Sequence, residues 1–294
     1  MIVVLDIGGT FIKHALMDDT GEILSLNQIP TPRDHKEHFV EVIKQIWESY
    51  PQPKEGLAIS LPGTIEIKSG MIYQGGSLQY LNQTNGKELL EGICHTRVEL
   101  ENDARCATLA EVWKGNLQGI DQGMVLTFGT GIGGSFVLNG DLYKGAHLFS
   151  GEVSGWLTKD IKTYGRDAMW GNQGSIPALL KRICDQKQVS IQDGKTVFGW
   201  IEQGDPIACE IFHNYCKDLS IQLFNLQILL DPQRLCIGGG VSANPVFIKG
   251  IMDAMNTFYA SLPLTLPHLE IVPCHFHNDA NLIGAFHHFQ KQAS

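Results

Sequence analysis

The sequence predicts an α/β protein of two domains that repeat one βββαβα plan, with a cleft between the domains. Two glycine-rich turns carry this prediction, one at Asp6 to Thr10 and one at Gly129 to Gly134. Each turn follows an apolar strand, and each is followed by a second strand and a polar turn. One supersecondary unit therefore occurs twice in the chain.

The first half begins with three strands and ends with a helix. Apolar patterning predicts strands at residues 2–6, 11–17, 22–28, 57–61 and 98–101. Apolar residues at helical spacing between Phe39 and Tyr50 predict one helix. A second helix begins at the N-cap residues Asn102 and Asp103 and ends at Gly115. Residues 64–90 are predicted to be irregular.

The second half repeats the plan and adds a long helix. A strand at residues 124–128 leads through the second glycine turn to a hairpin with an Asn139-Gly140 turn. The long helix spans residues 207–230, and a strand at 235–237 runs into Gly238-Gly239-Gly240. A last helix is expected at residues 280–290. We place one domain at residues 1–116 plus 282–294 and the other at 117–281, with a hinge near 115–120.

Composition narrows the class of protein. The net charge is −9 without a basic cluster, which argues against a nucleic-acid partner. No signal-peptide pattern is evident at the N-terminus, and no apolar run approaches the roughly 20 residues of a membrane span, so we expect a cytoplasmic protein. The seven cysteines are scattered without a C-x2-C pair, which favours buried reduced thiols over disulfides or a local zinc site.

The glycine turns indicate a nucleotide-dependent phosphotransferase. Glycines at a strand end allow backbone N–H groups to approach a phosphate that a Cβ would block. Asp6 lies beside the first turn, where its carboxylate can hold Mg²⁺, most readily through water. The alternative is that Asp6 only caps its own turn. The second turn favours the functional interpretation.

Asp103 is the candidate base for an acceptor hydroxyl. It lies at the N-terminus of a helix, where the helix dipole favours the ionised carboxylate. Phosphoryl transfer through a loose transition state depends more on orientation than on a strong base. The alternative for Asn102 and Asp103 is plain helix capping.

Two further features are suggestive only in combination. Glu152 follows Gly151 on a loop, and a carboxylate there suits vicinal hydroxyls. Taken alone, Glu152 fits a solvated loop charge better than a sugar contact. Gly238-Gly239-Gly240 could let a flat base lie against backbone, although glycine triplets are also common in turns.

In combination these motifs resemble the ROK family of bacterial sugar kinases. The segments that carry the resemblance, in chain order, are Asp6 to Thr10, Leu61-Pro62-Gly63, Glu101 to Ala104, Gly129 to Gly134, Asn139-Gly140 and Gly151-Glu152. The resemblance runs from the first strand to the last helix. It implies an actin-like, ribonuclease H-like fold, ATP and Mg²⁺ as cofactors, phosphorylation of a sugar hydroxyl, usually the 6-OH, and a homodimer.

The resemblance also implies roles for individual residues. Asp103 would be the base, and Asn102 and Glu152 would bind the sugar, which Gly63 and the segment around Gly76 would border. Residues expected to serve Mg·ATP are Asp6, Gly8, Gly9, Thr10, Thr130, Gly131, Gly133 and Gly134. Gly239 and Gly240 would flank the adenosine.

Departures from the family pattern narrow the substrate. Gly155 stands where most members carry a histidine, and residues 164–172 replace the cysteine-rich segment that binds structural zinc. We therefore expect no zinc. The pattern resembles the β-glucoside kinases, and Trp156, Tyr164 and Trp170 could stack on a second sugar ring. Alternatively, these aromatic residues only rebuild the core.

The sequence thus predicts an ATP-dependent kinase that acts on the 6-hydroxyl of the non-reducing glucose of a β-glucoside such as cellobiose. We expect in-line attack on the γ-phosphate after closure of the two domains, with Asp103 accepting the proton. One alternative is an N-acetylmannosamine kinase or glucokinase. Another is a non-catalytic sugar sensor of the same family, which the retained Asp103 disfavours.

Overall fold

The computed structural model describes residues 1–292, which form two compact units. The first unit comprises Met1–Gln118, Lys144–Ser150 and the chain from Asn278 onward. The second comprises Gly119–Tyr143 and Gly151–His277. Residues 144–150 and 278–281, which the sequence pattern assigns to the second domain, thus pack with the first unit.

A five-stranded sheet forms the centre of the first unit, in the order β3-β2-β1-β4-β8. The strands are β1 (Ile2–Ile7), β2 (Phe11–Met17), β3 (Ile23–Pro30), β4 (Gly56–Leu61) and β8 (Arg97–Asn102). Strands β1 to β3 pair antiparallel, whereas β1, β4 and β8 run parallel. The carboxyl ends of these three parallel strands meet at one edge, where Asp6 lies opposite Ser60 in the register and Asn102 lies opposite Leu61.

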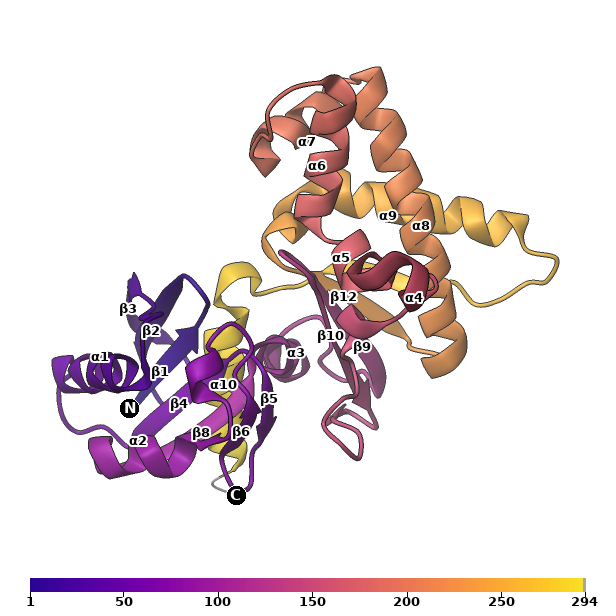
Figure 1. Ribbon diagram of the computed structural model, residues 1–294. Helices are drawn as coiled ribbons and strands as arrows, with labels where there is room; N and C mark the ends of the chain where they lie inside the picture. Colours follow the sequence, from indigo (N-terminus) through magenta and orange to yellow (C-terminus); the bar gives the residue numbers. More distant parts are fainter. Residues whose placement is uncertain (293–294) are drawn as a thin grey trace. The chain divides into compact units, whose positions relative to one another are not determined.

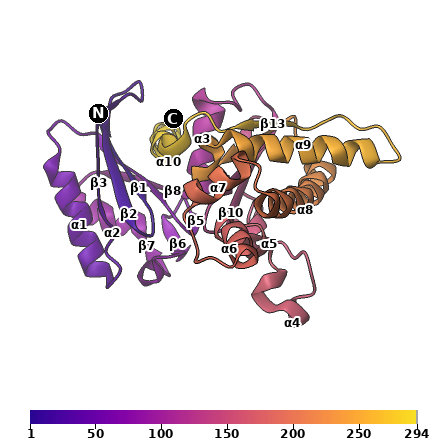
Figure 2. The same ribbon diagram turned by 90° about the horizontal axis from the view of Figure 1, so that it is seen from above.

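Helices cover both faces of this sheet. The helices α1 (Lys36–Ser49) and α2 (Gly86–Cys94) lie on one face, and α3 (Asp103–Lys114) and α10 (Ala280–Lys291) lie on the other (Figures 1 and 2). Side chains of β1 alternate between the two layers: Val3 and Leu5 pack on the α1 side, and Ile2 and Val4 pack on the α10 side. This period of two is what a strand buried on both faces requires.

The prediction of an irregular segment at residues 64–90 is wrong. The segment contains a small antiparallel sheet of β5 (Thr64–Glu66), β6 (Met71–Gln74) and β7 (Thr84–Asn85), with the 3-10 turn η1 (Gln79–Leu81) between β6 and β7, and its last residues begin helix α2. Ile65 and Ile72 bury this sheet against the core of the first unit. Strands of two to four residues are too short to show a period in the sequence.

The second unit repeats the same sheet, which confirms the predicted duplication. Its order is β11-β10-β9-β12-β13, with β9 to β11 antiparallel and β9, β12 and β13 parallel. The strands are β9 (Gln122–Phe128), β10 (Ile132–Leu138), β11 (Asp141–Tyr143), β12 (Arg234–Gly238) and β13 (Glu270–Pro273). All five strands of the first sheet were predicted from the sequence, whereas β13 of the second sheet was not.

A helical insertion between β11 and β12 covers one face of the second sheet (Figure 1). The helices of this unit are α4 (Ile161–Tyr164), α5 (Trp170–Gln173), α6 (Ile176–Lys187), α7 (Gly194–Glu202), α8 (Pro206–Leu230) and α9 (Pro245–Ser261). Met124, Leu126 and Phe128 of β9 point into the core that helices α6 to α9 complete. Within residues 1–292, no helix combines the length and apolar character needed to cross a membrane.

Candidate active site

The first glycine turn offers backbone donors at the end of β1. Gly8 donates its N–H to the Phe11 carbonyl at 3.0 Å, and Arg33 Nε donates to the Gly9 carbonyl at 2.6 Å. Within residues 1–292, no hydrogen-bond acceptor reaches the amides of Gly9 and Thr10. Unpaired amides in a glycine turn are the donors that a phosphate oxygen requires.

Asp6 stands beside this turn as a half-buried carboxylate. Burial raises the pKa of Asp6 above its usual value, and hydrogen bonds from Asn281 and Ser60 oppose that rise. Both bonds end on Oδ1, and no hydrogen bond from the described part of the chain reaches Oδ2. A carboxylate oxygen left open beside a phosphate turn fits Mg²⁺, which prefers oxygen ligands and retains much of its water shell.

The residues predicted to face the acceptor also assemble in the first unit. Asn102 caps α3 by accepting the Arg105 N–H at 3.1 Å, and its Nδ2 donates to the Gly63 carbonyl at 3.0 Å. Gly63 has a φ of +114°, and a Cβ there would lie 1.9 Å from the Gln74 carbonyl oxygen. Only glycine fits this close approach.

Gly76 and Asp103 are the other residues of the first unit that were predicted to face the acceptor. A Cβ on Gly76 would lie 3.4 Å from the Gly63 nitrogen, so these two glycines are neighbours. Asp103 is the first residue of α3, and its Oδ1 accepts the Ala104 N–H at 2.8 Å. The neighbouring Ser77 borders the first glycine turn, since a Cβ on Gly9 would lie 3.0 Å from Ser77 Oγ.

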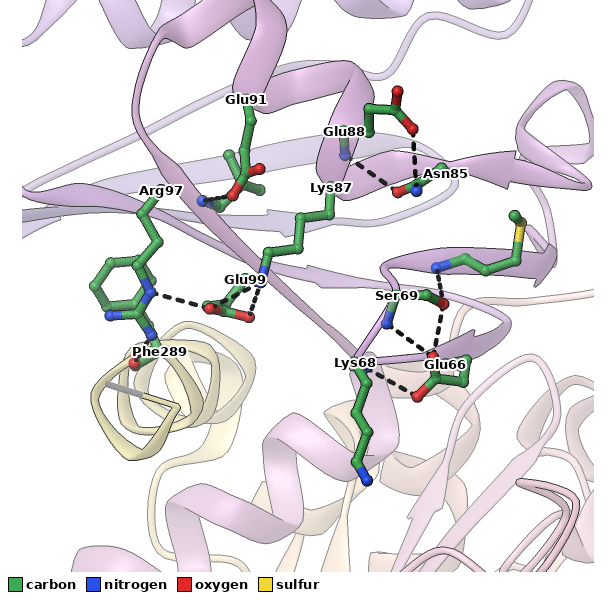
Figure 3. Close-up of polar contacts among 12 residues, drawn as sticks. Glu66, Lys68, Ser69, Asn85, Lys87, Glu88, Glu91, Arg97, Glu99 and Phe289 are labelled. Atoms are coloured by element: carbon green, nitrogen blue, oxygen red, sulfur yellow. Dashed lines mark hydrogen bonds and ion pairs between the residues drawn. The ribbon is translucent and has the colours of Figure 1, made fainter. Parts of the chain in front are cut away.

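Two ion pairs fix the strand that carries Asn102. Figure 3 shows Lys87 and Arg97 approaching the buried carboxylate of Glu99, with Lys87 Nζ at 3.1 and 3.0 Å and Arg97 Nε at 3.0 Å. Arg97 also donates through Nη2 to the Phe289 carbonyl at 2.7 Å. The first half of strand β8 is therefore tied to both α2 and α10.

A second buried carboxylate, Glu101, lies directly before Asn102, and our sequence reasoning assigned it no role. Glu101 is fully buried, accepts from Lys144 Nζ and from the Asn102 N–H, and faces Arg105 Nη1 at 3.9 Å. Arg105 Nη2 donates in turn to the Leu148 carbonyl at 2.6 Å. These contacts anchor segment 144–150 on the first unit. The spacing of Glu101 and Arg105 by four residues gives no helix-pair signal, because Glu101 lies in β8 and Arg105 lies in α3.

The second glycine turn also offers unpaired donors. Gly129 donates to the Gly131 carbonyl at 3.0 Å, and its own carbonyl accepts the Ile176 N–H at 3.1 Å. No acceptor in the described residues reaches the amides of Thr130 and Gly131. Gly133 and Gly134, in contrast, are part of strand β10.

Glu152 is held next to this second turn. A Cβ on Gly134 would lie 2.7 Å from the Gly151 carbonyl oxygen, and a Cβ on Gly151 would lie 2.5 Å from that of Gly134. This mutual close approach places the exposed Glu152 beside β10. The predicted residues thus form two groups: Asn102, Asp103, Gly63 and Gly76 with the first turn, and Glu152 with the second.

A cavity of about 590 Å³ lies within the second unit beside the second turn. Its walls include the apolar side chains Phe128, Ile176, Phe198 and Val241, and its rim includes Gly240. Gly239 has a φ of +86°, and a Cβ there would lie 2.2 Å from the Phe128 carbonyl oxygen. A mostly apolar cavity of this size, next to backbone N–H groups that have no acceptor, suits the base and ribose of a nucleotide.

The three aromatic residues predicted to stack on a second sugar ring have different environments. Trp170 is only 3% exposed and packs in the core of the second unit, so it cannot stack on a ligand ring. Trp156 is half-buried against the same core, whereas Tyr164 is 52% exposed. Within residues 1–292, no group of three or more His, Cys, Asp or Glu side chains is arranged to hold a metal ion.

Comparison with known proteins places this geometry in a family. The model of the ROK family matches residues 2–292. The β-glucoside kinase of Listeria innocua is 30% identical over 99% of this chain and 98% of its own length, and that of Klebsiella pneumoniae is 31% identical over 99% and 96%. A solved Listeria monocytogenes protein, described as a proposed N-acetylmannosamine kinase, has a TM-score of 0.91 at 28% identity, covering 100% of this chain and 99% of that one.

These matches span the chain from its first strand to its last helix and bring with them the actin-like ATPase fold, with its duplicated domain. The resemblance first noted in the sequence motifs is therefore confirmed. The chain belongs to the ROK family.

Proposed function

We propose that this ATP-dependent carbohydrate kinase phosphorylates the 6-hydroxyl of the non-reducing glucose in a β-glucoside such as cellobiose. The observation that carries the proposal is the group formed by Asn102, Asp103, Gly63 and Gly76 beside the first glycine turn. The choice of sugar is supported by the β-glucoside kinases that match this chain along its whole length at about 30% identity.

In the proposed reaction, Asp103 accepts the proton of the sugar hydroxyl as it attacks the γ-phosphate. The carboxylate is fixed for this task, because Oδ1 accepts the Ala104 N–H and Asn102 caps the same helix. Fixed orientation matters more than basicity here, since the hydroxyl proton leaves late in a loose transition state. Asn102 and Glu152 are the proposed sugar contacts.

Each glycine turn is proposed to bind phosphate. The amides of Gly9 and Thr10 and those of Thr130 and Gly131 donate to phosphate oxygens, and the cavity near Gly239 and Gly240 takes the base. Mg²⁺, when bound with the nucleotide, supplies positive charge against the phosphates. Asp6 would hold it, through water, with the open Oδ2.

Tyr164 and Trp156 are the remaining candidates for stacking on a second sugar ring. Tyr164 is exposed and Trp156 is half-buried, whereas Trp170 is buried, so the aromatic surface proposed for the aglycone is smaller than the sequence indicates. The rival substrates are N-acetylmannosamine, favoured by the described relative from Listeria monocytogenes, and free glucose.

A homodimer is also proposed, and sedimentation equilibrium would test it.

A coupled ADP-release assay with Mg·ATP tests the proposal. We expect kcat/KM for cellobiose to exceed that for glucose, N-acetylglucosamine and N-acetylmannosamine. Preference for one of these monosaccharides would retain the kinase and overturn the β-glucoside assignment. Sugar binding without ADP release from any of them would instead support a non-catalytic sensor.

A further inference from the structure

The carboxylate of Asp6 is held by two donors that converge on one oxygen. Ser60 Oγ of β4 and Asn281 Nδ2 of α10 each lie 3.0 Å from Asp6 Oδ1. Within residues 1–292, Oδ2 accepts no hydrogen bond. The two bonds therefore distinguish the two oxygens, one fixed to the protein and one left open.

This arrangement joins distant parts of the first unit. Asn281 lies at the start of α10, 275 residues from Asp6 in sequence, while Ser60 lies opposite Asp6 in the register of the parallel strands. Lys13 Nζ adds a second link, because it donates to the Asn278 carbonyl at 2.8 Å. The segment 278–281 is thus fastened to β1 and β2 just before the first glycine turn.

We propose that Asn281 and Ser60 are positioning residues that orient Asp6 so that Oδ2 faces the metal ion of the bound nucleotide. Mg²⁺ demands near-octahedral geometry, so a carboxylate that can rotate holds its water shell less well. Residues that hydrogen-bond to a metal-binding group commonly change metal affinity by roughly 10- to 100-fold when removed. This inference rests on the role proposed above for Asp6.

The alternative is that Asn281 only docks α10 onto the sheet. Other contacts already perform that docking. Leu282 and Phe286 are fully buried in the core beneath the sheet, and a Cβ on Gly284 would lie 1.7 Å from the Cys106 carbonyl oxygen of α3. Removing one amide from Asn281 should therefore leave the helix in place.

The test measures metal affinity directly, by electron paramagnetic resonance of Mn²⁺ bound with the non-hydrolysable analogue AMPPNP. We expect Asn281→Leu to weaken Mn²⁺ binding about 10-fold and to raise the Mg²⁺ concentration for half-maximal activity by a similar factor. Ser60→Ala should act in the same direction. The KM for the sugar should change less than about twofold, since neither residue belongs to the acceptor group.

The matched control is Gln290→Leu. Gln290 is an amide on the same helix, and its Nε2 donates to the Asp19 carbonyl at 2.9 Å, away from Asp6. We expect Mn²⁺ affinity to be unchanged in this variant. An equal loss of affinity in Gln290→Leu would assign the effect to helix docking and overturn the inference.

Asp6→Asn separates this inference from the proposed function. If Asp6→Asn weakens Mn²⁺ binding but both folded variants Asn281→Leu and Ser60→Ala retain wild-type affinity, the positioning role is wrong and the role of Asp6 stands. If Asp6→Asn also binds Mn²⁺ normally, the proposed metal role of Asp6 fails. Should Asn281→Leu not fold, Ser60→Ala alone decides between these outcomes.

Discussion

The two glycine turns of this chain have the same backbone setting but different surroundings. Both follow the central strand of a sheet with the same order and strand directions, and both leave two consecutive amides without an acceptor in the described residues. The penultimate residue of β1 is Asp6, whereas that of β9 is Thr127. Only the first turn therefore has a carboxylate in this position.

The two turns also differ in the apolar space beside them, which is found at the second turn. The second turn borders a cavity of about 590 Å³ lined by Phe128, Ile176 and Phe198. The first turn instead borders the polar segment of Ser77 and, through it, Gly76 and Asn102. In the proposed assignment, metal and acceptor chemistry belong to the first unit and base recognition belongs to the second.

The largest expected effect comes from removing Asp103, the proposed base on the first unit. Asp103→Asn should lower kcat by about 10²- to 10⁴-fold, the range typical of a general base, with sugar binding retained. Steady-state kinetics would measure kcat, and calorimetric titration would measure sugar binding. Asp19→Asn, at an exposed acid of the same unit, is the control and should behave like wild type. Near-normal turnover in Asp103→Asn would contradict the assignment.

A smaller effect is expected from the backbone at the second unit's cavity. Gly239→Ala combines a φ of +86° with a Cβ 2.2 Å from the Phe128 carbonyl oxygen. Such strain costs about 1–3 kcal/mol of the free energy of unfolding, and displacement of the cavity wall should raise the KM for ATP. Gly199→Ala, on α7 and outside the residues that line the cavity, is the matched control, because its Cβ would meet nothing within 4 Å. Urea unfolding and ATP kinetics of both variants test the contrast, which equal behaviour would refute.

The smallest effect is expected from replacing Arg33, an exposed side chain that hydrogen-bonds to the first turn. Arg33 donates to the Gly9 carbonyl at 2.6 Å and to Thr10 Oγ1 at 3.3 Å. An exposed contact of this kind contributes at most about 1 kcal/mol, so Arg33→Gln should raise the KM for ATP about two- to fivefold. Lys249→Gln, in an exposed ion pair of the second unit, should leave it unchanged. A change above tenfold in Arg33→Gln would mean that Arg33 itself binds phosphate.

Local signals in the sequence predicted the parts of the fold that depend on local interactions. The glycine turns, the strands that flank them and the Asn102 cap of α3 are read from adjacent residues. The small sheet at residues 64–85 was missed because its strands are short and gain stability from burial of Ile65 and Ile72.

The supports of the site could not be predicted in the same way. Asn281 reaches Asp6 across 275 residues, and Arg105 reaches Leu148 across 43. The partners of such contacts are chosen by the packing of whole elements, which no short pattern records. The burial of Trp170 has the same origin, since its surroundings come from the helical insertion between β11 and β12.

The central claim is that the first unit binds the acceptor sugar and the second unit binds the base of the nucleotide. Hydrogen–deuterium exchange tests this claim most directly. With AMPPNP alone, we expect slower amide exchange at residues 129–131 and 240–245. With cellobiose alone, we expect it at residues 101–105 and around Gly63 and Gly76. Nucleotide protection confined to residues 101–105, with no change at 129–131 or 240–245, would contradict the account.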